Sequence, residues 1–341
     1  MDFWATWCAP CVANMPHLET LQEKYQDQLL IVPVSFEEED RINKFISNKP
    51  YKLQFSIDNE NKLRSLFPFR IIPHAVLIDP FGKIVAITDP KNITEEIIAK
   101  LLNGEEILLP IKQDRVDFNL MKDDLFELPA NTKQSFKVLG EFEGLPSFQK
   151  SEMVGEYKGR RITFINQSIR GIFQDVFDKG WRRFQINEHD TKRLEEEMYS
   201  IDLVIENPNE VELKTTLLTK MEQQFDLQID TVKVESETIL LYVEDENKLP
   251  KRSEQNYPYS ASGDHFTSKG ATIADFASYL EGFGIIGGIV VCDDCQEKSF
   301  EIDFHFEPEN PDSFWDNLKN LGLNLKKETR EVEMIRIREL D

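Results

Sequence analysis

The sequence has few cysteines, a shortage of basic residues and no long apolar run. Its 341 residues include only four cysteines, too few for a disulfide scaffold of this size. Acidic residues outnumber basic ones by 62 to 40, and the formal net charge of −22 disfavours nucleic acid or an anionic membrane surface as a partner. No apolar stretch approaches the roughly twenty residues that span a bilayer. These shortages exclude a small disulfide-rich fold and predict neither nucleic-acid binding nor a transmembrane segment in this sequence.

The remaining composition is that of a globular protein with more than one domain. Hydrophobic residues make up 40% of the chain, and 24 phenylalanines are enough for substantial cores. Residues 1–105 alternate between helix and strand patterns, whereas residues 106–134 are charged and weakly periodic. We therefore expect a first domain over 1–105, a linker over 106–134 and a second domain over 135–341.

The first eleven residues carry the clearest chemical signal, the Cys-x-x-Cys pair Cys8 and Cys11. A cysteine at the first turn of a helix is favoured as a thiolate by unpaired backbone N–H groups and by the helix dipole. Cys11 follows one turn later, within disulfide reach, and Pro10 fixes a helix-compatible backbone. The spacing predicts a redox-active pair. Half of a metal site is the weaker alternative, and we expect no metal and no cofactor other than the redox-active disulfide.

Hydrophobic periodicity predicts the order strand, helix, strand, helix, strand, strand, helix for the first domain. A helix pattern follows Cys11, and residues 29–36 form a buried strand. Residues 69–79 form another strand that turns at 80–83 into the next one. Thr94 is expected to cap the last helix. This order predicts an α/β sandwich with mixed strand directions.

These residues resemble the thioredoxin superfamily, and in particular the exported TlpA-like thiol-disulfide oxidoreductases. The resemblance is carried by residues 4–11 (WATWCAPC), by Ile72-Pro73 and by the turn 78–83. It covers about residues 1–105 and implies a thioredoxin fold that is incomplete at its N-terminus, because the family's first strand and helix have no counterpart. It also implies a periplasmic or cell-envelope location, with an export signal or anchor ahead of Met1.

The resemblance implies roles for the residues around the thiol pair. Cys8 is expected to be the exposed nucleophile that attacks a substrate disulfide, and Cys11 the buried thiol that resolves the mixed disulfide. Asp2 stands where thioredoxins carry a buried aspartate, and Glu38 where several TlpA-like proteins place a glutamate near the resolving thiol. Either carboxylate would help Cys11 lose its proton. The alternatives are that Asp2 occupies a frayed terminus and that Glu38 belongs to a solvated acidic turn.

Substrate contacts are implied by the same resemblance. Ile72-Pro73 corresponds to the cis-proline that faces the disulfide, where the Ile72 backbone would pair with an extended substrate strand. His74 follows directly, and it either favours the thiolate from nearby or is an exposed bystander. The other residues expected at this surface are Trp7, Ala9 and Pro10.

Residues 135–341 predict an α+β domain with a weak internal repeat. The segments that follow Pro208 and Pro311 each read as helix, strand, turn and strand, which gives two similar subunits over about 135–250 and 263–341. The region resembles an uncharacterised domain of soil-associated bacteria and Bacteroidetes, and its end resembles small secretin and TonB-receptor N-terminal domains. An interaction role is the most that this resemblance implies. It is carried by residues 159–163, 272–276 and 318–323.

A second Cys-x-x-Cys pair, Cys292 and Cys295, lies in a predicted turn between two strands. The adjacent Asp293 and Asp294 would raise the thiol pKa values, and no helix lowers them, so a nucleophile is not expected here. The first interpretation is a structural disulfide that closes a hairpin. The alternatives are a disulfide that exchanges electrons with the first pair, a free thiol pair, or half of a metal site.

Two functions of different classes fit this sequence. The first is an extracytoplasmic protein thiol-disulfide oxidoreductase, most simply a reductase. Its partners would be protein disulfide or dithiol clients, with a membrane thiol reductase as electron donor. The second is an envelope binding protein that uses a thioredoxin-like scaffold with little or no redox turnover.

Overall fold

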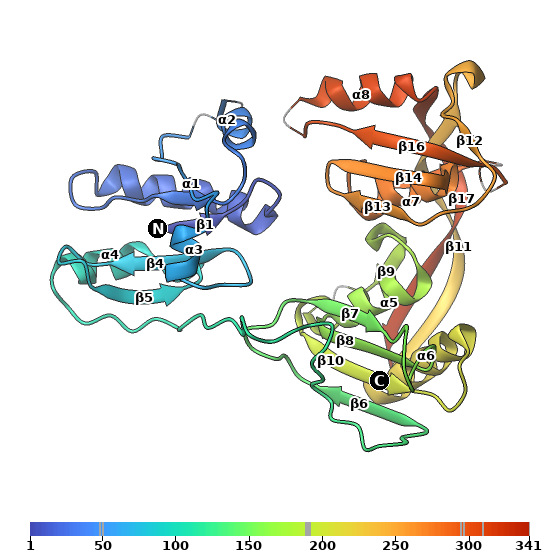
Figure 1. Cartoon of the computed structure of the whole chain (residues 1–341), viewed down its shortest axis with the longest axis horizontal. Helices are drawn as coiled ribbons and strands as arrows, with labels where there is room; N and C mark the ends of the chain where they lie inside the picture. The colour runs from blue at the N-terminus through green and yellow to red at the C-terminus, as the bar shows by residue number, and fades with distance from the viewer. Residues whose placement is uncertain are drawn as a thin grey trace. The chain divides into compact units, whose positions relative to one another are not determined.

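The computed structural model describes residues 1–47, 49, 51–187, 192–293, 295, 297–308 and 310–340. Its contacts divide the chain into two units (Figure 1). Unit 1 comprises Met1–Leu125 and Phe142–Ser147, and unit 2 comprises Phe126–Glu141 and Phe148–Asp341. The expected linker 106–134 is therefore divided between the units, because residues up to 125 pack onto the first. Among the described residues, no helix is long and apolar enough to span a bilayer.

Unit 1 is built on one five-stranded sheet with helices on both faces. Its elements are β1 (Asp2–Trp4), α1 (Ala9–Lys24), β2 (Pro33–Ser35), α2 (Glu39–Ser47), β3 (Ser56–Ile57), α3 (Lys62–Leu66), β4 (His74–Ile78), β5 (Ile84–Thr88) and α4 (Glu95–Leu102). The sheet order is β3-β2-β1-β4-β5, with β1 parallel to β2 and antiparallel to β4. The seven predicted elements occur in the expected order with mixed strand directions, but the structure adds β3 and α3 between α2 and β4, and the strands are shorter than expected.

The central strand β1 separates two hydrophobic cores because successive side chains point to opposite faces of the sheet. Trp4 belongs to the core beneath α1, α2 and α4, which also contains both cysteines. Phe3 belongs to the opposite core with Val34, Phe69 and Val76. Side chains on the Trp4 face of β1 therefore lie on the same side of the sheet as the thiol pair, and those on the Phe3 face lie on the other side.

Local sequence signals explain where several of these elements begin and turn. The side chain of Thr94 accepts a hydrogen bond from the Ile97 amide and caps α4, as predicted. The turn between β4 and β5 closes through a backbone hydrogen bond from Asp79 to Lys83, with Gly82 at φ +82°. Pro16 lies inside α1 without ending it.

Unit 2 contains the same order of strands and helices twice. The first copy has β6 (Ser135–Leu139), β7 (Phe148–Ser151), β8 (Arg161–Gln167), α5 (Ile169–Phe177), β9 (Phe184–Ile186), β10 (Tyr199–Val204), α6 (Glu210–Phe225) and β11 (Leu227–Val243). The second has β12 (Arg252–Ser253), β13 (Tyr259–Ser262), β14 (His265–Thr272), α7 (Ile273–Gly282), β15 (Ile289–Cys292), β16 (Ser299–His305), α8 (Pro311–Asn320) and β17 (Leu323–Glu339). The sheets β6-β10-β8-β7 and β12-β16-β14-β13 have matching orders. The duplication therefore extends over more of each copy than the sequence pattern indicates.

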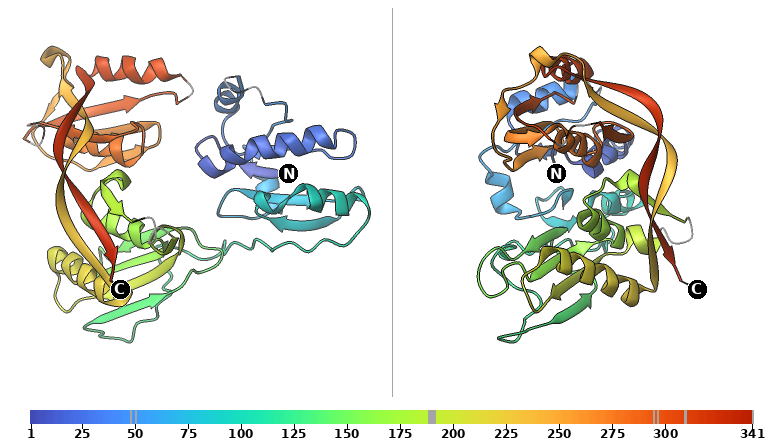
Figure 2. Two further views of the ribbon diagram at one scale, coloured as in Figure 1. Left: turned by 180° about the vertical axis from the view of Figure 1, so that it is seen from behind. Right: turned by 90° about the vertical axis from the view of Figure 1, so that its right-hand side faces the viewer.

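The long strands β11 and β17 join the two copies and correct the predicted repeat. They pair antiparallel over their whole length, from Leu227 opposite Glu339 to Val243 opposite Leu323 (Figure 2). Each helix is thus followed by one continuous strand rather than by strand, turn and strand. Neither strand contains glycine or proline, so the polar middle of each has no residue that breaks the pairing. The short strands are exchanged, since β9 pairs with β17 and β15 with β11.

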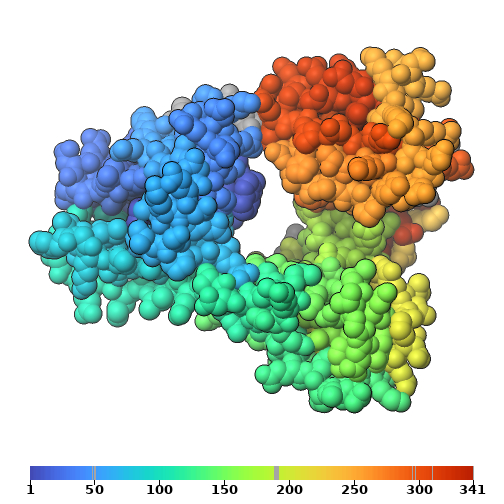
Figure 3. Space-filling view, viewed as in Figure 1, coloured from blue at the N-terminus to red at the C-terminus, as the bar shows by residue number. Residues whose placement is uncertain are grey.

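Each copy in unit 2 has its own core, and the two copies contact each other. One core is formed by residues of α5, α6, β8 and β10, and the other by residues of α7, α8, β14 and β16. The space-filling view shows the yellow-green surface that includes α5 beneath the orange second copy (Figure 3). Arg183, which follows α5, makes an ion pair with Glu281 of α7.

Candidate functional site

Cys8 and Cys11 are joined in a disulfide at the N-terminus of α1, with a Cα–Cα distance of 5.3 Å. Cys8 is the N-cap residue, and its sulfur lies 3.3 Å from the Cys11 backbone nitrogen, which donates to it. The first N–H groups of the helix and its dipole therefore favour negative charge on this sulfur. Cys11 is fully buried, and Cys8 is only 4% exposed in this disulfide form. The expected contrast between an exposed and a buried cysteine is thus small, because both pack into the core beneath α1.

The two cysteines are buried, but several residues next to them are exposed. Ala9 and Pro10 begin α1 and are exposed. The side chain of Trp7 is 65% exposed and contacts Phe36 edge to face, with 6.4 Å between ring centroids. The Ile72–Pro73 peptide bond is cis, and Ile72 packs against the core that contains both cysteines. A partner that approaches the disulfide would therefore meet Trp7 and the helix start.

Asp2 is buried on the same side of the sheet as the disulfide. Its side chain lines a cavity of about 40 Å³ together with residues of α1 and α4, such as Leu18 and Ile98. Neither carboxyl oxygen has a hydrogen-bond partner among the described residues. Burial raises the pKa of Asp2 to about 7, and the amino group of Met1 offsets only part of this effect. Asp2 is therefore a buried group that can gain or lose a proton near neutral pH, rather than a side chain at a frayed terminus.

A carboxylate that the sequence interpretation missed, Glu37, contacts the loop that precedes Cys8. One Glu37 oxygen accepts the Thr6 amide at 2.6 Å and the other accepts the Thr6 hydroxyl at 2.8 Å. Ser35 donates to the same carboxylate at 3.2 Å, and Arg41 donates to the Thr6 hydroxyl. Glu37 thereby holds the turn that leads from β1 to Cys8.

Glu38, the residue named from the resemblance, is exposed and lies directly before α2. Its backbone carbonyl accepts hydrogen bonds from Arg41 and Ile42 and so starts the helix. The structure therefore does not bring this side chain into the buried surroundings of Cys11. The reason is that α2 begins at the next residue and leaves Glu38 at the surface.

His74 is neither near the thiols nor exposed, which corrects both interpretations of this residue. It is 2% exposed and lies opposite Phe3 in the antiparallel pair of β4 and β1, so it points to the sheet face away from the disulfide. Its ring stacks on Phe69 with 4.9 Å between centroids. Burial lowers the pKa of His74 to about 4, and the charge of Lys112 acts in the same direction. His74 is therefore neutral at pH 7.

Cys292 and Cys295 form a second disulfide, with a Cα–Cα distance of 5.9 Å. It does not close a hairpin, because β15 pairs with β11 whereas the following strand β16 pairs with β14. Asp293 makes a two-pronged ion pair with Arg330 of β17, which lowers the pKa of Asp293. Asp294 lies outside the described residues. Among the described residues, no group of three or more His, Cys, Asp and Glu side chains is placed to hold a metal ion.

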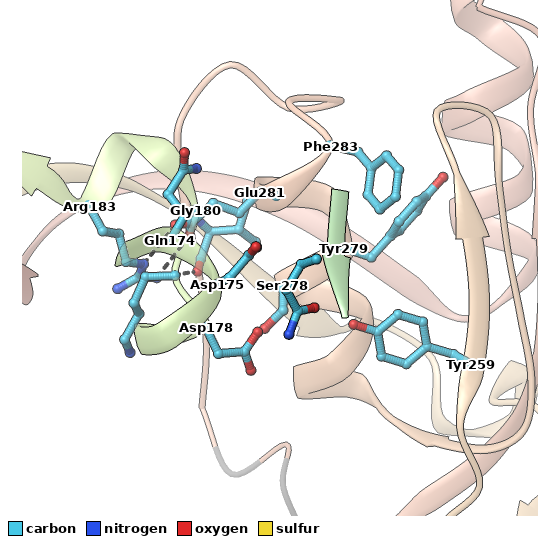
Figure 4. A pocket seen from close by; sticks show the side chains of 14 residues that line it. Gln174, Asp175, Asp178, Gly180, Arg183, Tyr259, Ser278, Tyr279, Glu281 and Phe283 are labelled. Carbon is cyan, nitrogen blue, oxygen red and sulfur yellow. Dashed lines mark hydrogen bonds and ion pairs between the residues drawn. The ribbon is translucent and has the colours of Figure 1, made fainter. Parts of the chain in front are cut away.

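A cavity of about 430 Å³ lies between α5 and α7 in unit 2 (Figure 4). Asp175 and Asp178 line it from the end of α5, and Tyr259 from β13 points its hydroxyl toward it. Beside them, the buried Glu281 accepts two hydrogen bonds from Arg183, at 2.7 and 2.9 Å. Among the residues that the structure describes, no cysteine lines this cavity.

The comparisons with known proteins cover part of the chain. Residues 1–84 match a family model described as thioredoxin-like. The thiol-disulfide oxidoreductase ResA of Bacillus anthracis is 31% identical over 87 residues, which are 25% of this chain and 50% of the relative. The thioredoxin-like protein YneN of Bacillus subtilis is 33% identical over 87 residues, 25% of this chain and 51% of the relative. The chain thus spans about half the length of these curated relatives.

Two solved structures are similar to part of the chain. One is described as a thiol:disulfide interchange protein DsbE from Chlorobium tepidum, with 27% identity, a TM-score of 0.28, and coverage of 30% of this chain and 77% of that one. The other is StoA from Bacillus subtilis, with 20% identity, a TM-score of 0.24, and coverage of 26% and 69%. With the matching family model and the disulfide at the start of α1, the N-terminal part of this chain is a thioredoxin-like domain.

Proposed function

We propose that this protein is a thiol-disulfide oxidoreductase that exchanges disulfides with protein clients through Cys8 and Cys11. The observation that carries the proposal is the position of Cys8, whose sulfur lies at the start of α1 and is bonded to Cys11 one turn later. Relatives that are named thiol-disulfide oxidoreductases match 87 residues of this chain with 31% identity. A binding role without redox turnover would not require Cys8 to lie where its thiolate is favoured, so we favour disulfide exchange.

The proposed exchange begins with the reduced protein. The Cys8 thiolate attacks one sulfur of a client disulfide, forms a mixed disulfide and releases the client's other sulfur as a thiolate. The Cys11 thiolate then attacks the Cys8 sulfur, which releases the client's second thiol and restores the Cys8–Cys11 bond. The client gains two electrons and two protons, and the protein loses them. A membrane thiol reductase would reduce the pair again.

Asp2 is the proposed proton acceptor for the resolving step. Cys11 is fully buried, and burial disfavours its thiolate form. Asp2 is also buried on the α1 side of the sheet, and its pKa of about 7 lets it take up a proton at neutral pH. Because neither Asp2 oxygen has a hydrogen-bond partner among the described residues, it would accept the Cys11 proton through an intervening water molecule and pass it to the departing client thiolate.

The surface beside the disulfide is the proposed client-binding surface. Trp7 would contact the client with its exposed ring, next to Ala9 and Pro10. The backbone of Ile72, before the cis Pro73, would pair with an extended segment of the client. We further propose a reductase role in the periplasm or cell envelope, on the strength of the sequence resemblance to exported TlpA-like proteins.

Reduction of insulin disulfides by the full chain tests the proposal. With dithiothreitol as electron source, the chain should accelerate insulin reduction, and Cys8→Ser should remove the acceleration. The matched control is the pair Cys292→Ser and Cys295→Ser, which removes the other disulfide and should leave the rate unchanged. If the acceleration survives in Cys8→Ser, the activity does not come from this cysteine and the proposal is wrong.

A further inference from the structure

Residues 112–118, in the segment expected to be a linker, bind the loop that precedes Pro73. One oxygen of Asp114 accepts the backbone amides of Arg70 and Ile71, each at 2.7 Å. The ammonium group of Lys112 donates to the Ile71 carbonyl at 2.7 Å and to the two Asp114 oxygens at 2.9 and 3.0 Å. The pair therefore binds both polar backbone groups of Ile71.

Further contacts fix this segment on unit 1. The Lys112 amide donates to the Ile87 carbonyl of β5 at 2.9 Å. The guanidinium of Arg70 in turn donates hydrogen bonds to the carbonyl of Val116 at 2.9 Å and to that of Phe118. Residues 112–118 and the loop before Pro73 therefore each donate hydrogen bonds to the other, and these bonds fix both segments in place.

The Lys112–Asp114 pair is shielded from water, which strengthens its hydrogen bonds. The Asp114 side chain is 2% exposed and that of Lys112 is 17% exposed. Burial alone would raise the pKa of Asp114, but the hydrogen bonds from Ile71, Lys112 and Arg70 outweigh it and lower the pKa. Asp114 is thus a carboxylate at neutral pH, and its hydrogen bonds are the stronger, charge-assisted kind.

The contacts stop one residue before the cis peptide bond. The amides of Arg70 and Ile71 and the Ile71 carbonyl are all bound, whereas no hydrogen bond to the Ile72 backbone is found among the described residues. Ile72 also packs against the core that contains both cysteines. The Ile72 backbone is therefore available in this loop to pair with an incoming chain.

We propose that Lys112 and Asp114 are positioning residues for the exchange reaction. They hold residues 70–71 so that the Ile72 backbone stays in place to pair with an extended client segment beside the disulfide. This inference rests on the proposed function. It predicts that these two residues matter for a disulfide within a peptide chain, which can use this pairing, and not for a small aromatic disulfide, which cannot.

The test compares two substrates in the full-length protein. Asp114→Ala should raise KM for a disulfide-containing peptide about tenfold, the change expected when hydrogen bonds to a charged group are lost. Its rate with 5,5′-dithiobis(2-nitrobenzoic acid), which has no backbone, should stay within about twofold. Asp114→Asn keeps a carbonyl oxygen for the two amides and should restore part of the peptide affinity. The matched control is Asp117→Asn, an exposed aspartate of the same segment.

Each outcome decides the inference. An equal loss on both substrates in Asp114→Ala, or no loss on the peptide, overturns it. If Asp114→Ala does not fold, Lys112→Met must show the same selective rise in KM for the inference to stand. A wild-type protein that reduces neither substrate refutes the proposed function, and this inference with it. A wild-type protein that reduces both, without selectivity in the variants, refutes this inference alone.

Discussion

His74 lies directly opposite Phe3 where β4 pairs with β1, and the two rings are 5.8 Å apart between centroids. Because Trp4 occupies the other face of β1, this pairing places His74 and the disulfide on opposite sides of the sheet. Asp2 lies on the disulfide side. The sheet thus separates two buried titratable groups, Asp2 and His74. The pKa of Asp2 is raised and that of His74 is lowered, so their contributions to the free energy of unfolding change in opposite directions with pH.

His74 should make unit 1 less stable as the pH falls. Its pKa is about 4 in the folded protein and about 6.5 in the unfolded chain, so between these values only the unfolded chain binds the proton. The contribution to the free energy of unfolding therefore decreases by about 1.4 kcal/mol per pH unit on going from pH 6.5 to 4. His74→Gln should remove this decrease, measured by urea unfolding at several pH values. An unchanged slope in the variant would contradict the account.

Asp2 should act in the opposite direction over nearly the same range. Its pKa is about 7 in the folded protein against about 4 in the unfolded chain, so the folded protein holds the proton longer. Its contribution to the free energy of unfolding falls by about 1.4 kcal/mol per unit as the pH rises from 4 to 7. Asp2→Asn should be more stable than the wild type at pH 8.

Each variant serves as the control for the other. In the wild type, the pH-dependent contributions of His74 and Asp2 to the free energy of unfolding nearly cancel between pH 4 and 6.5. Relative to the wild type, His74→Gln should lose stability with rising pH, and Asp2→Asn should gain it. Asp2→Asn should also slow release of a client from the mixed disulfide near pH 7, whereas His74→Gln should not. Equal kinetic effects in both variants would remove the proposed role of Asp2 as proton acceptor.

Glu37 and Glu38 provide a matched pair of neighbouring glutamates. Glu37→Gln weakens the charge-assisted bonds to Thr6 and should lower the free energy of unfolding by about 1–2 kcal/mol. Glu38→Gln changes an exposed side chain and should stay within about 0.5 kcal/mol of the wild type. Urea unfolding of both variants at pH 7 measures the difference. A larger loss in Glu38→Gln would show that the wrong glutamate has been assigned to the loop.

Arg183 should be essential for the stability of unit 2. Arg183→Met leaves the buried Glu281 carboxylate without its ion-pair partner, which costs about 3–5 kcal/mol. Adding Glu281→Leu removes the unpaired charge, so the double variant should recover much of the loss. Thermal unfolding of the single and double variants checks this order. A double variant that is no better than Arg183→Met would mean that the carboxylate is not the source of the loss.

The thiol pair and seven of the nine strands and helices of unit 1, all but β3 and α3, could be predicted because their signals are local. Cys8, Pro10 and Cys11 lie within one helical turn, and the strands and helices follow short periodic patterns. The side assignment of His74 depends on its register with Phe3, a residue 71 positions earlier in the chain, which periodicity cannot supply. The choice between Glu37 and Glu38 depends on where α2 begins, and Asp40, the preferred cap type in this acidic run, would place that start after the observed one at Glu39.

The missed features of the later sequence depend on distant partners. Lys112 and Asp114 lie in a charged segment typical of a linker, and their contacts are with residues 70 and 71. The long strand β11 contains a polar stretch that resembles a turn until its pairing with β17 is known. The exchange of β9 and β15 between the copies likewise cannot be predicted without the tertiary structure.

Capture of the mixed disulfide tests the central claim most directly. Reduced Cys11→Ser, mixed with a disulfide-containing peptide at pH 7, should form a one-to-one adduct on Cys8 that persists because no resolving thiol is present. Mass spectrometry should locate the peptide on Cys8, and dithiothreitol should release it. Complete absence of the adduct on a reduced and folded protein would contradict the account.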